Sequence, residues 1–372
     1  MTAQPFTSER IHELVSRNPA NGEEIGRAAL MTASDVAASV RYARAAQPAW
    51  AALSYRERAE YILRARKLVL AQTDEIANLI SRETGKPPME ALSMEVVPTL
   101  DLMNHFARHT EKMLQREKID IGQYGVFGRA SYIFYKPLGV VGIISPWNFP
   151  WATPLDEVVM ALMAGNAVVL KPSELTSLTA LKIGAIFKEA RLPKGLLEIV
   201  TGDGSTGTAL VETGVDKIMF TGSVATGKRV AEAAAKHLTP VVLELGGKDP
   251  MIVLDDADLE NAARAAIWGA FCNSGQACAS IERCYVQESV AQEFIAHVVE
   301  ETRTLQQGQP SVEGVDVGAM TNERQLQIVE RHVSDALAKG ARDETGGKCL
   351  TDTRGWFHEP TVMTNVDHSM EV

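Results

Sequence analysis

The chain has 372 residues, of which 45% are apolar and 23% are charged, and its formal net charge is −10. This composition is typical of a globular protein of two or more domains. An acidic balance of this size disfavours nucleic acid and membrane surfaces as partners, because both bind concentrated basic surfaces. The polar segment Met1 to Arg10 has no apolar signal core, and no apolar run is long enough to span a membrane.

The four cysteines, without a secretory signal, favour a cytoplasmic location in which thiols stay reduced. Cys272, Cys278 and Cys284 are evenly spaced, but a metal site needs closer pairs or histidines at ligand spacing. We therefore expect no metal site. Cys272 and Cys284 are expected to be small, buried, apolar residues, as most cysteines are.

The first part of the chain reads as helical. Apolar residues at helical spacing predict helices over Ser34 to Trp50, Tyr55 to Thr73 and Asp74 to Thr84. Met89 to Gln115 predicts one long helix. The segment Gly122 to Tyr135 then alternates between apolar and small residues, which predicts a protruding hairpin.

Short apolar strands alternate with helices from residue 137 onward. The predicted strands are Gly139 to Ser145, Ala167 to Lys171, Leu197 to Thr201, Lys217 to Thr221 and Val241 to Glu244. This alternation is typical of a parallel sheet with crossover helices, which binds its ligand at the carboxyl ends of the strands. The pattern restarts at Pro250 to Leu254, which predicts a second α/β domain.

Three residues have the chemistry of a catalytic site. Cys278 ends the segment F-C-N-S-G-Q-A-C, in which Gly275 permits a sharp turn. Glu244 ends an apolar strand, where burial would raise its pKa and suit it to act as a general base. Asn148 lies in the turn S-P-W-N-F-P, and its fixed amide can donate to a developing oxyanion. Taken singly, Cys278 and Glu244 are better interpreted as a core cysteine and a solvated strand-end glutamate, and Asn148 can equally be a turn-forming residue.

Two glycine-rich segments compete for the role of a phosphate-binding loop. Gly202 to Gly207 (GDGSTG) matches G-x-G-x-x-G between a predicted strand and a helix, and Gly222 to Gly227 (GSVATG) occupies an equivalent place. Either can present backbone N–H groups to a phosphate. The spacing alone favours the first.

Together these segments resemble the aldehyde dehydrogenase superfamily from about Asn18 onward. The motifs that carry the resemblance are, in order, S-P-W-N-F-P, G-N-A-V-V-L-K-P-S-E, F-T-G-S-V-A-T-G, L-E-L-G-G-K-D-P and G-Q-A-C. The resemblance implies an α/β fold, with a Rossmann-type parallel-sheet cofactor domain, an incomplete α/β catalytic domain and a protruding β-hairpin. We expect the helical part at residues 1–119, the oligomerisation hairpin at 120–136, the NAD-binding domain at 137–246 and the catalytic domain at 247–372.

The resemblance implies that the chain is an NAD(P)-dependent enzyme that oxidises an aldehyde to the carboxylic acid. Cys278 looks like the nucleophile, which passes through a thiohemiacetal and a thioester. Glu244 looks like the base that activates the hydrolytic water. Asn148, with the backbone N–H of Cys278, looks like the oxyanion hole.

The resemblance also implies a set of cofactor-binding residues. Lys171 and Glu174 look like the residues that hold the adenosine ribose, Ser223 looks like a pyrophosphate ligand, and Gly204 lies near the adenine. The phosphate-side turn is therefore Gly222 to Gly227, against the choice that spacing alone favours. The other expected contacts are Ser145, Pro146, Trp147, Ser173, Phe220, Thr221, Gly222, Gly227, Leu245 and Gly246. Because Glu174 would repel a 2′-phosphate, we expect NAD, with NADP possible through Lys171.

In the family an E-x-F-G-P segment, whose glutamate contacts the nicotinamide ribose, would follow Val372. The chain is therefore expected to be truncated at its C-terminus. The family assembles as dimers or tetramers, and loss of the C-terminal pairing strand would weaken that assembly. Two alternatives stay open: an inactive remnant that binds nucleotide or partners, and an acyl-transferring relative, which Glu244 disfavours. Trp147, Trp151 and Phe271 indicate either an aromatic-lined substrate entrance or core packing.

Overall fold

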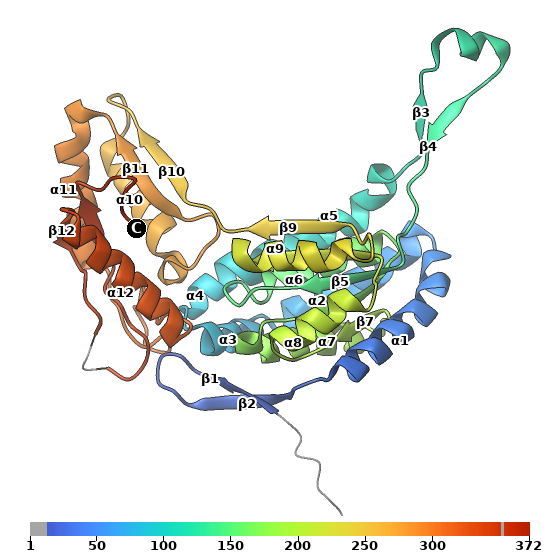
Figure 1. The fold of residues 1–372 in the computed structure, drawn as a ribbon, viewed down its shortest axis with the longest axis horizontal. Coiled ribbons are helices and arrows are strands. Elements are labelled where there is room, and N and C mark those ends of the chain that lie inside the picture. Colours follow the sequence, from blue (N-terminus) through green and yellow to red (C-terminus); the bar gives the residue numbers. More distant parts are fainter. Residues whose placement is uncertain (1–12, 351–352) are drawn as a thin grey trace, which may run out of the picture.

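The computed structural model describes residues 13–350 and 353–372, so the polar segment Met1 to Arg10 lies outside the described residues. Two lobes of different size are visible in Figure 1. The larger lobe is built on a five-stranded sheet, and the smaller lobe contains the strands and helices from residue 249 onward. A narrow hairpin projects from the larger lobe on the side away from the smaller one.

The five-stranded sheet is entirely parallel, and its strands follow the order β7-β6-β5-β8-β9. Its members are β5 (Val140–Ile144), β6 (Ala167–Lys171), β7 (Leu197–Ile199), β8 (Lys217–Gly222) and β9 (Val241–Leu245). All five predicted strands are confirmed, with bounds that shift by two residues at most. Strand order reverses direction at β5, which pairs with both β6 and β8. This is the switch point at which open α/β sheets bind ligands.

Helices cover both faces of this sheet. The crossover helices are α6 (Ala152–Met163), α7 (Ser177–Glu189), α8 (Gly204–Glu212) and α9 (Val224–Ala235). The preceding helices are α1 (Ala33–Ala51), α2 (Tyr55–Ala71), α3 (Thr73–Thr84), α4 (Pro88–Ala91) and α5 (Val97–Met113). Helix α1 packs with α8 on one face, while α2 and α5 pack with α6 on the other. With both faces covered, the central strands β5 and β6 are buried almost throughout rather than on alternate residues.

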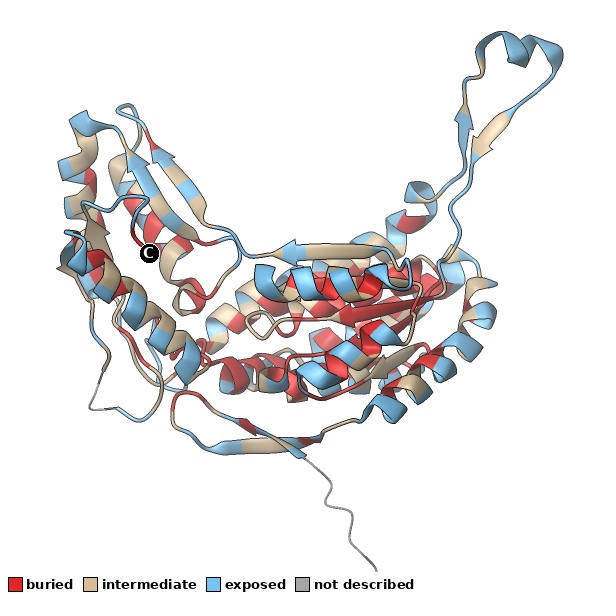
Figure 2. Ribbon diagram, in the orientation of Figure 1, coloured by how far each residue is buried: buried red, intermediate tan, exposed pale blue. Residues whose placement is uncertain are grey.

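The two lobes differ in how much apolar surface they bury. One continuous cluster of buried residues runs through the sheet and helices of the larger lobe. The main cluster of the smaller lobe contains six buried residues: Val253, Ala263, Ala266, Ile267, Phe294 and Val298. Figure 2 shows the same contrast, with buried residues concentrated around the parallel sheet. The sheet edge that positions the candidate site therefore rests on the better packed lobe.

The smaller lobe contains a parallel pair of strands, as predicted from the restarted pattern. Its elements are β10 (Asp249–Val253), α10 (Leu259–Phe271), β11 (Ile281–Val286), α11 (Glu288–Thr304), α12 (Glu323–Ala338), β12 (Arg342–Thr345) and β13 (Val362–Thr364). Strands β10 and β11 form the parallel pair. Strands β12 and β13 form a separate, antiparallel pair. Helix α10 begins at an Asp258 cap that accepts from the Asn261 N–H.

The prediction that the first part is wholly helical is wrong for its beginning. Strands β1 (Glu13–Arg17) and β2 (Glu24–Ala29) form an antiparallel pair. The turn between them follows from local chemistry: the Asn18 side chain accepts from the Ala20 N–H, and Gly22 adopts a φ of 79°. Asparagine and glycine tolerate this geometry at low cost, so the N-P-A-N-G segment is the signal for a hairpin.

Two other predicted segments show more detail than the sequence pattern predicts. A hairpin is present, with β3 (Glu117–Ile119) paired to β4 (Ser131–Ile133), but its first strand lies before the predicted start at Gly122. The segment Gly122–Phe127 forms a 3-10 turn at its tip. The single helix predicted over Met89 to Gln115 consists of α4, a π-helical turn at Leu92–Val96, and α5. None of the helices within the described ranges is long and apolar enough to cross a membrane.

The lobes touch through a close contact of main chains. Gly85 ends α3 with a φ of 88°, and its carbonyl accepts from the Ala319 N–H at 3.0 Å. A Cβ atom at Gly85 would lie 2.6 Å from the Ala319 oxygen. Glycine is therefore required here both for the left-handed backbone and for the approach of the other lobe.

Replacing Gly85 with alanine is expected to lower the free energy of unfolding by at least about 2 kcal/mol, because the left-handed backbone and the contact with Ala319 both oppose a Cβ atom. Gly22→Ala is the matched control, since Gly22 has a φ of 79° but nothing within 4 Å of its Cβ position. It should cost about 1 kcal/mol. Urea unfolding of both variants measures the difference, and equal losses would contradict a tight contact at Gly85.

Candidate active site

The residues predicted to be catalytic come from three separate segments. Strand β9 ends at Leu245, so Glu244 lies at the carboxyl edge of the parallel sheet and is exposed. The chain then passes through Gly246 and Gly247, and a Cβ at Gly247 would lie 3.9 Å from the carbonyl oxygen of Cys278. The loop after Glu244 therefore reaches the segment that carries Cys278.

Asn148 makes the second connection to that segment. Its amide nitrogen donates to the Gln276 carbonyl at 2.9 Å, two residues before Cys278. Its side-chain oxygen accepts from the Phe149 N–H at 3.1 Å. The orientation of the amide is thereby defined, and one of its two N–H bonds is left for another acceptor.

The loop before Cys278 has an unusual backbone. Helix α10 ends at Phe271, and Asn273 and Ser274 then adopt left-handed φ values of 53° and 55°. The buried Asn273 amide donates to the Asn148 carbonyl and to the Gln276 carbonyl, both at 3.0 Å. Left-handed backbone at non-glycine residues is costly and concentrates at functional sites. Here it turns the chain so that the residues before Cys278 contact the Asn148 turn.

Gln276 holds this loop against the rest of the smaller lobe. Its side-chain nitrogen donates to the Asn273 carbonyl at 2.9 Å, and its side-chain oxygen accepts from the Thr321 N–H at 3.0 Å. The Thr321 hydroxyl in turn donates to the Thr84 carbonyl at 2.8 Å. The loop that carries Cys278 is thus fixed to both lobes.

The cysteines differ in environment. Cys278 is exposed, whereas Cys272 is buried as expected. Burial, together with the nearby Glu90 carboxylate, raises the pKa of the Cys272 thiol to about 11. The expectation of burial is wrong for Cys284, which lies exposed on β11. Within residues 13–350 and 353–372, no three His, Cys, Asp or Glu side chains are grouped as metal ligands.

The expected burial of Glu244 is wrong, because its side chain is exposed. The buried carboxyl is instead that of Glu157 on α6, which is 5% exposed. Desolvation raises the pKa of the Glu157 carboxyl to about 8, the Thr221 hydroxyl at 3.4 Å opposes that shift, and the charges of Asp156 and Glu244 add to it. Burial likewise raises the pKa of Asp156 to about 7. Sequence reasoning missed this pair, although two adjacent acids in the apolar helix L-D-E-V-V-M are a visible signal.

The predicted cofactor residues lie at the carboxyl ends of four of the strands and at the loop after the fifth. At the end of β6, the Lys171 ammonium is buried and lies 3.4 Å from the half-exposed Glu174 carboxylate. Burial lowers the pKa of Lys171, and the Glu174 charge opposes this. Ser173 caps the 3-10 turn that follows, by accepting from the Leu175 N–H. Gly204 begins α8 and has no neighbour within 4 Å of its Cβ position.

A second group of predicted cofactor residues surrounds the switch point. Ser223 caps α9 by accepting from the Thr226 N–H, and its helix begins directly after β8. A Cβ at Gly227 would lie 2.7 Å from the Leu245 side chain, so glycine allows α9 to approach β9. Ser145, at the end of β5, is buried and its hydroxyl has no partner among the described atoms. The remaining members lie in the last residues of β8 or directly after β5 and β9: Phe220, Thr221, Gly222, Pro146, Trp147 and Gly246.

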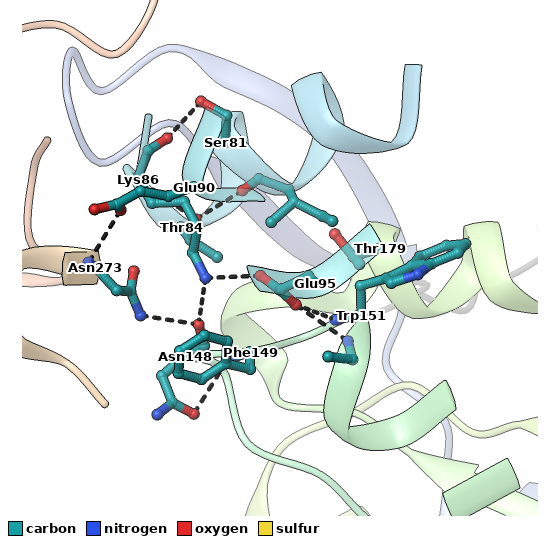
Figure 3. Close-up of polar contacts among 12 residues, drawn as sticks. Ser81, Thr84, Lys86, Glu90, Glu95, Asn148, Phe149, Trp151, Thr179 and Asn273 are labelled. Atoms are coloured by element: carbon teal, nitrogen blue, oxygen red, sulfur yellow. Dashed lines mark hydrogen bonds and ion pairs between the residues drawn. The ribbon is translucent and has the colours of Figure 1, made fainter. Parts of the chain in front are cut away.

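The aromatic residues of the expected entrance separate into two environments. Trp151 has no exposed surface, and its indole N–H donates to the Thr99 hydroxyl at 3.2 Å, so it belongs to the core. Trp147 and Phe271 are half-buried. Sequence reasoning also missed Lys86, whose ammonium donates to the Asn148 carbonyl at 2.8 Å (Figure 3).

Comparison with known proteins places this geometry in a family. A model described as the aldehyde dehydrogenase family matches residues 6–372. The chain is 43% identical over 341 residues to a putative succinate-semialdehyde dehydrogenase (NADP+) 2 of Mycobacterium tuberculosis. It is 39% identical over 355 residues to a 4,4′-diapolycopene aldehyde oxidase of a Methylomonas species. These matches cover 91% and 95% of this chain but 65% and 66% of the relatives, so the chain spans just under two thirds of their length.

The fold is similar to that of solved aldehyde dehydrogenases. The solved structure of an aldehyde dehydrogenase of Bacillus cereus, in complex with NAD+, matches with a TM-score of 0.92 and 32% sequence identity. That match covers 97% of this chain and 73% of the other. The motifs, the order of the parallel sheet and the family match agree, and the chain therefore belongs to the aldehyde dehydrogenase family.

Proposed function

We propose that the chain oxidises an aldehyde to the carboxylic acid through a thioester on Cys278. The observation that carries the proposal is the hydrogen bond from the Asn148 amide to the Gln276 carbonyl. It brings an oxyanion donor next to the loop of an exposed cysteine, beside the main chain that follows Glu244. A nucleophile, an oxyanion donor and a carboxylate base are the groups that acyl chemistry of this kind needs.

The proposed steps use these groups in turn. The Cys278 sulfur adds to the aldehyde carbon, and the oxyanion is held by the free N–H of Asn148 and the backbone N–H of Cys278. A donor of this kind contributes about 3 kcal/mol in the transition state. A dinucleotide held at the sheet edge would supply the acceptor for the hydride that leaves the substrate carbon as the thioester forms. The exposed Glu244 carboxylate then takes a proton from water, whose oxygen attacks the thioester and releases the acid.

The predicted cofactor residues fit a dinucleotide. Ser145 has a buried hydroxyl without a partner, which a ligand can satisfy. The N-terminus of α9 and its Ser223 cap lie at the switch point of the sheet, where a pyrophosphate is favoured by the exposed N–H groups. Gly204 follows β7 at the sheet edge, which supports the choice of Gly222 to Gly227 for the phosphate turn.

We propose NAD as the preferred cofactor, because the exposed Glu174 carboxylate would meet a 2′-phosphate with like charge. The adjacent Lys171 ammonium is engaged with Glu174 itself. Among the relatives, one is named for NADP+ and a solved structure holds NAD+, so the choice in this chain depends on its own residues.

A homo-oligomer and a cytoplasmic location belong to the same proposal. The projecting hairpin exposes large apolar side chains, which favours a subunit contact: Tyr124, Val126, Phe127, Ile133, Phe134 and Tyr135. All four cysteines of the described chain are unbridged, which supports a reducing compartment.

Cys278→Ala is expected to abolish the pre-steady-state burst of NADH with an aldehyde panel, because no thiohemiacetal can form. Cys284→Ala is the control, since it removes an exposed thiol of the same lobe and should leave the burst intact. Stopped-flow absorbance measures both.

If wild type and Cys278→Ala are equally inactive while NAD binds, the chain is a nucleotide-binding remnant. If coenzyme A rather than water releases the product, it is an acyl transferase.

Glu174→Gln is expected to raise the affinity for NADPH relative to NADH by about tenfold, because a like charge beside the 2′-phosphate is removed. Glu212→Gln, an exposed acid at the end of α8, should leave the ratio unchanged. Fluorescence titration of the two reduced nucleotides measures the ratio without turnover. An unchanged ratio for Glu174→Gln would remove this residue from the cofactor site.

Glu157 predicts a pH dependence of stability. Its pKa is raised from an ordinary value of 4.5 to about 8, so between these values the folded chain keeps a proton that the unfolded chain has lost. The contribution of this carboxyl to stability is therefore complete below the lower value and falls as the pH rises towards the upper one. Glu157→Gln cannot ionise and should gain stability over wild type in that interval, by at most about 1.4 kcal/mol per pH unit.

Urea unfolding at several pH values between the two limits measures this difference. Glu232→Gln, at an exposed position of α9, is the control and should differ from wild type by a constant amount. A constant difference for Glu157→Gln as well would show that Glu157 is ionised in the folded chain.

A further inference from the structure

Lys86 and Glu95 form an ion pair in which neither side chain has any exposed surface. The ammonium nitrogen lies 2.7 Å from one carboxylate oxygen of Glu95. Removing two charges from water is expensive, and a buried pair of this kind often stabilises a fold no better than apolar residues of the same size. The position of the pair, directly beside the turn that carries Asn148, suggests a different role (Figure 3).

The lysine holds one end of that turn. Besides Glu95, the Lys86 ammonium donates to the main-chain carbonyl of Asn148 at 2.8 Å. It also lies 4.3 Å from the centre of the Phe149 ring, where the face of the ring attracts a cation. Both contacts are with residues of the turn, 62 positions or more along the chain from the lysine.

The glutamate holds the other end. Its second carboxylate oxygen accepts from the main-chain N–H of Trp151 at 2.8 Å and of Ala152 at 3.2 Å. These N–H groups lie at the start of α6, where helical donors have no partner within the helix and a negative charge is favoured. One ion pair therefore binds the main chain on both sides of Phe149 and Pro150.

The main chain held in this way decides where the Asn148 amide lies. The turn runs between the end of β5 and the start of α6, outside regular secondary structure. The same Asn148 carbonyl that accepts from Lys86 also accepts from the Asn273 amide. Without the ion pair, the carbonyl would lose its ammonium donor and the start of α6 would lose its carboxylate, and the turn could rotate.

We propose that the Lys86–Glu95 pair positions Asn148. The pair orients the Asn148 amide, and the amide in turn contacts an aldehyde bound to Cys278. The inference rests on the proposed function. It implies that loss of the pair weakens oxyanion stabilisation, while the reactivity of the thiol and the binding of the dinucleotide stay as they are.

The test variant is Lys86→Met with Glu95→Gln, which removes both charges together and leaves no unpaired ion. We expect its single-turnover NADH burst with propanal to fall by about 100-fold, as small misplacements of catalytic groups do. The dissociation constant for NAD and the rate of Cys278 alkylation by iodoacetamide should match wild type. Lys182→Met with Glu75→Gln removes a Lys–Glu pair of 2.6 Å elsewhere in the larger lobe and should change none of these. An unchanged burst in the test variant would overturn the proposal.

A double-mutant cycle separates positioning from general destabilisation. In an Asn148→Ala background, the test variant should lose less than about threefold more, because its effect passes through the missing amide. A further loss of about 100-fold in that background would overturn the proposal. If the test variant does not fold, Glu95→Asp keeps the charge and withdraws it from the Trp151 N–H. Its smaller loss should likewise vanish in the Asn148→Ala background, and persistence of the loss would count against the proposal.

A second readout needs no nucleotide and no turnover. Addition of the Cys278 thiolate to propanal forms a C–S bond, moves the carbonyl π pair to oxygen, and protects the sulfur from iodoacetamide. Mass spectrometry of alkylation against propanal concentration should show protection in the test variant only at about tenfold higher aldehyde. Protection without an NADH burst in wild type would refute the proposed oxidation alone. Equal protection in both chains would refute the positioning role alone, and no protection in wild type would refute both.

Discussion

The hydrogen bond from the Asn148 amide to the Gln276 carbonyl is where the two lobes of the site meet. Asn148 is placed by the carboxyl edge of the parallel sheet, whereas Gln276 is placed by the left-handed residues after α10 and by Thr321. Neither lobe contains both groups. The proposed chemistry therefore depends on how the lobes are held together, and less on either fold alone.

Much of the fold and site follows from local sequence pattern. The five parallel strands are short apolar runs between helices. Asn148, Glu244 and Cys278 each lie in a motif that resembles one of the aldehyde dehydrogenase family. Contacts between segments that are distant in the sequence could not be predicted in this way. The Lys86–Asn148 bond spans 62 residues, and a lysine after a helix-ending glycine looks like a solvated surface residue. The exposure of Glu244 and the burial of Glu157 are equally decided by tertiary packing, which a strand or helix pattern does not encode.

The two lobes are not equally protected from opening. The smaller lobe buries few apolar side chains, and large ones remain exposed on β10, α10 and β11, including Ile252, Trp268 and Tyr285. Segments with little buried apolar surface open locally at lower free energy than a packed core. The proposed nucleophile, Cys278, lies in this lobe, whereas its proposed oxyanion donor, Asn148, lies in the other. The polar contacts that cross between them, from Thr321, Asn273 and Gly85, therefore bear on the site as well as on stability.

The π-helical turn at Leu92–Val96 sets which way the two ends of one long helix face. A turn of this type holds one residue more than an α-helical turn, which advances everything after it by about 100°. Before the turn, the Glu90 carboxylate accepts from the Asn273 N–H of the smaller lobe. Within it, the Glu95 carboxylate accepts from the Trp151 N–H at the start of α6. After it, the Thr99 hydroxyl accepts from the Trp151 indole N–H. Removing the extra residue of this turn would rotate Thr99 by about 100° relative to Glu90, so the contacts with Trp151 and Asn273 depend together on that residue. The length of this segment is therefore as constrained as its composition.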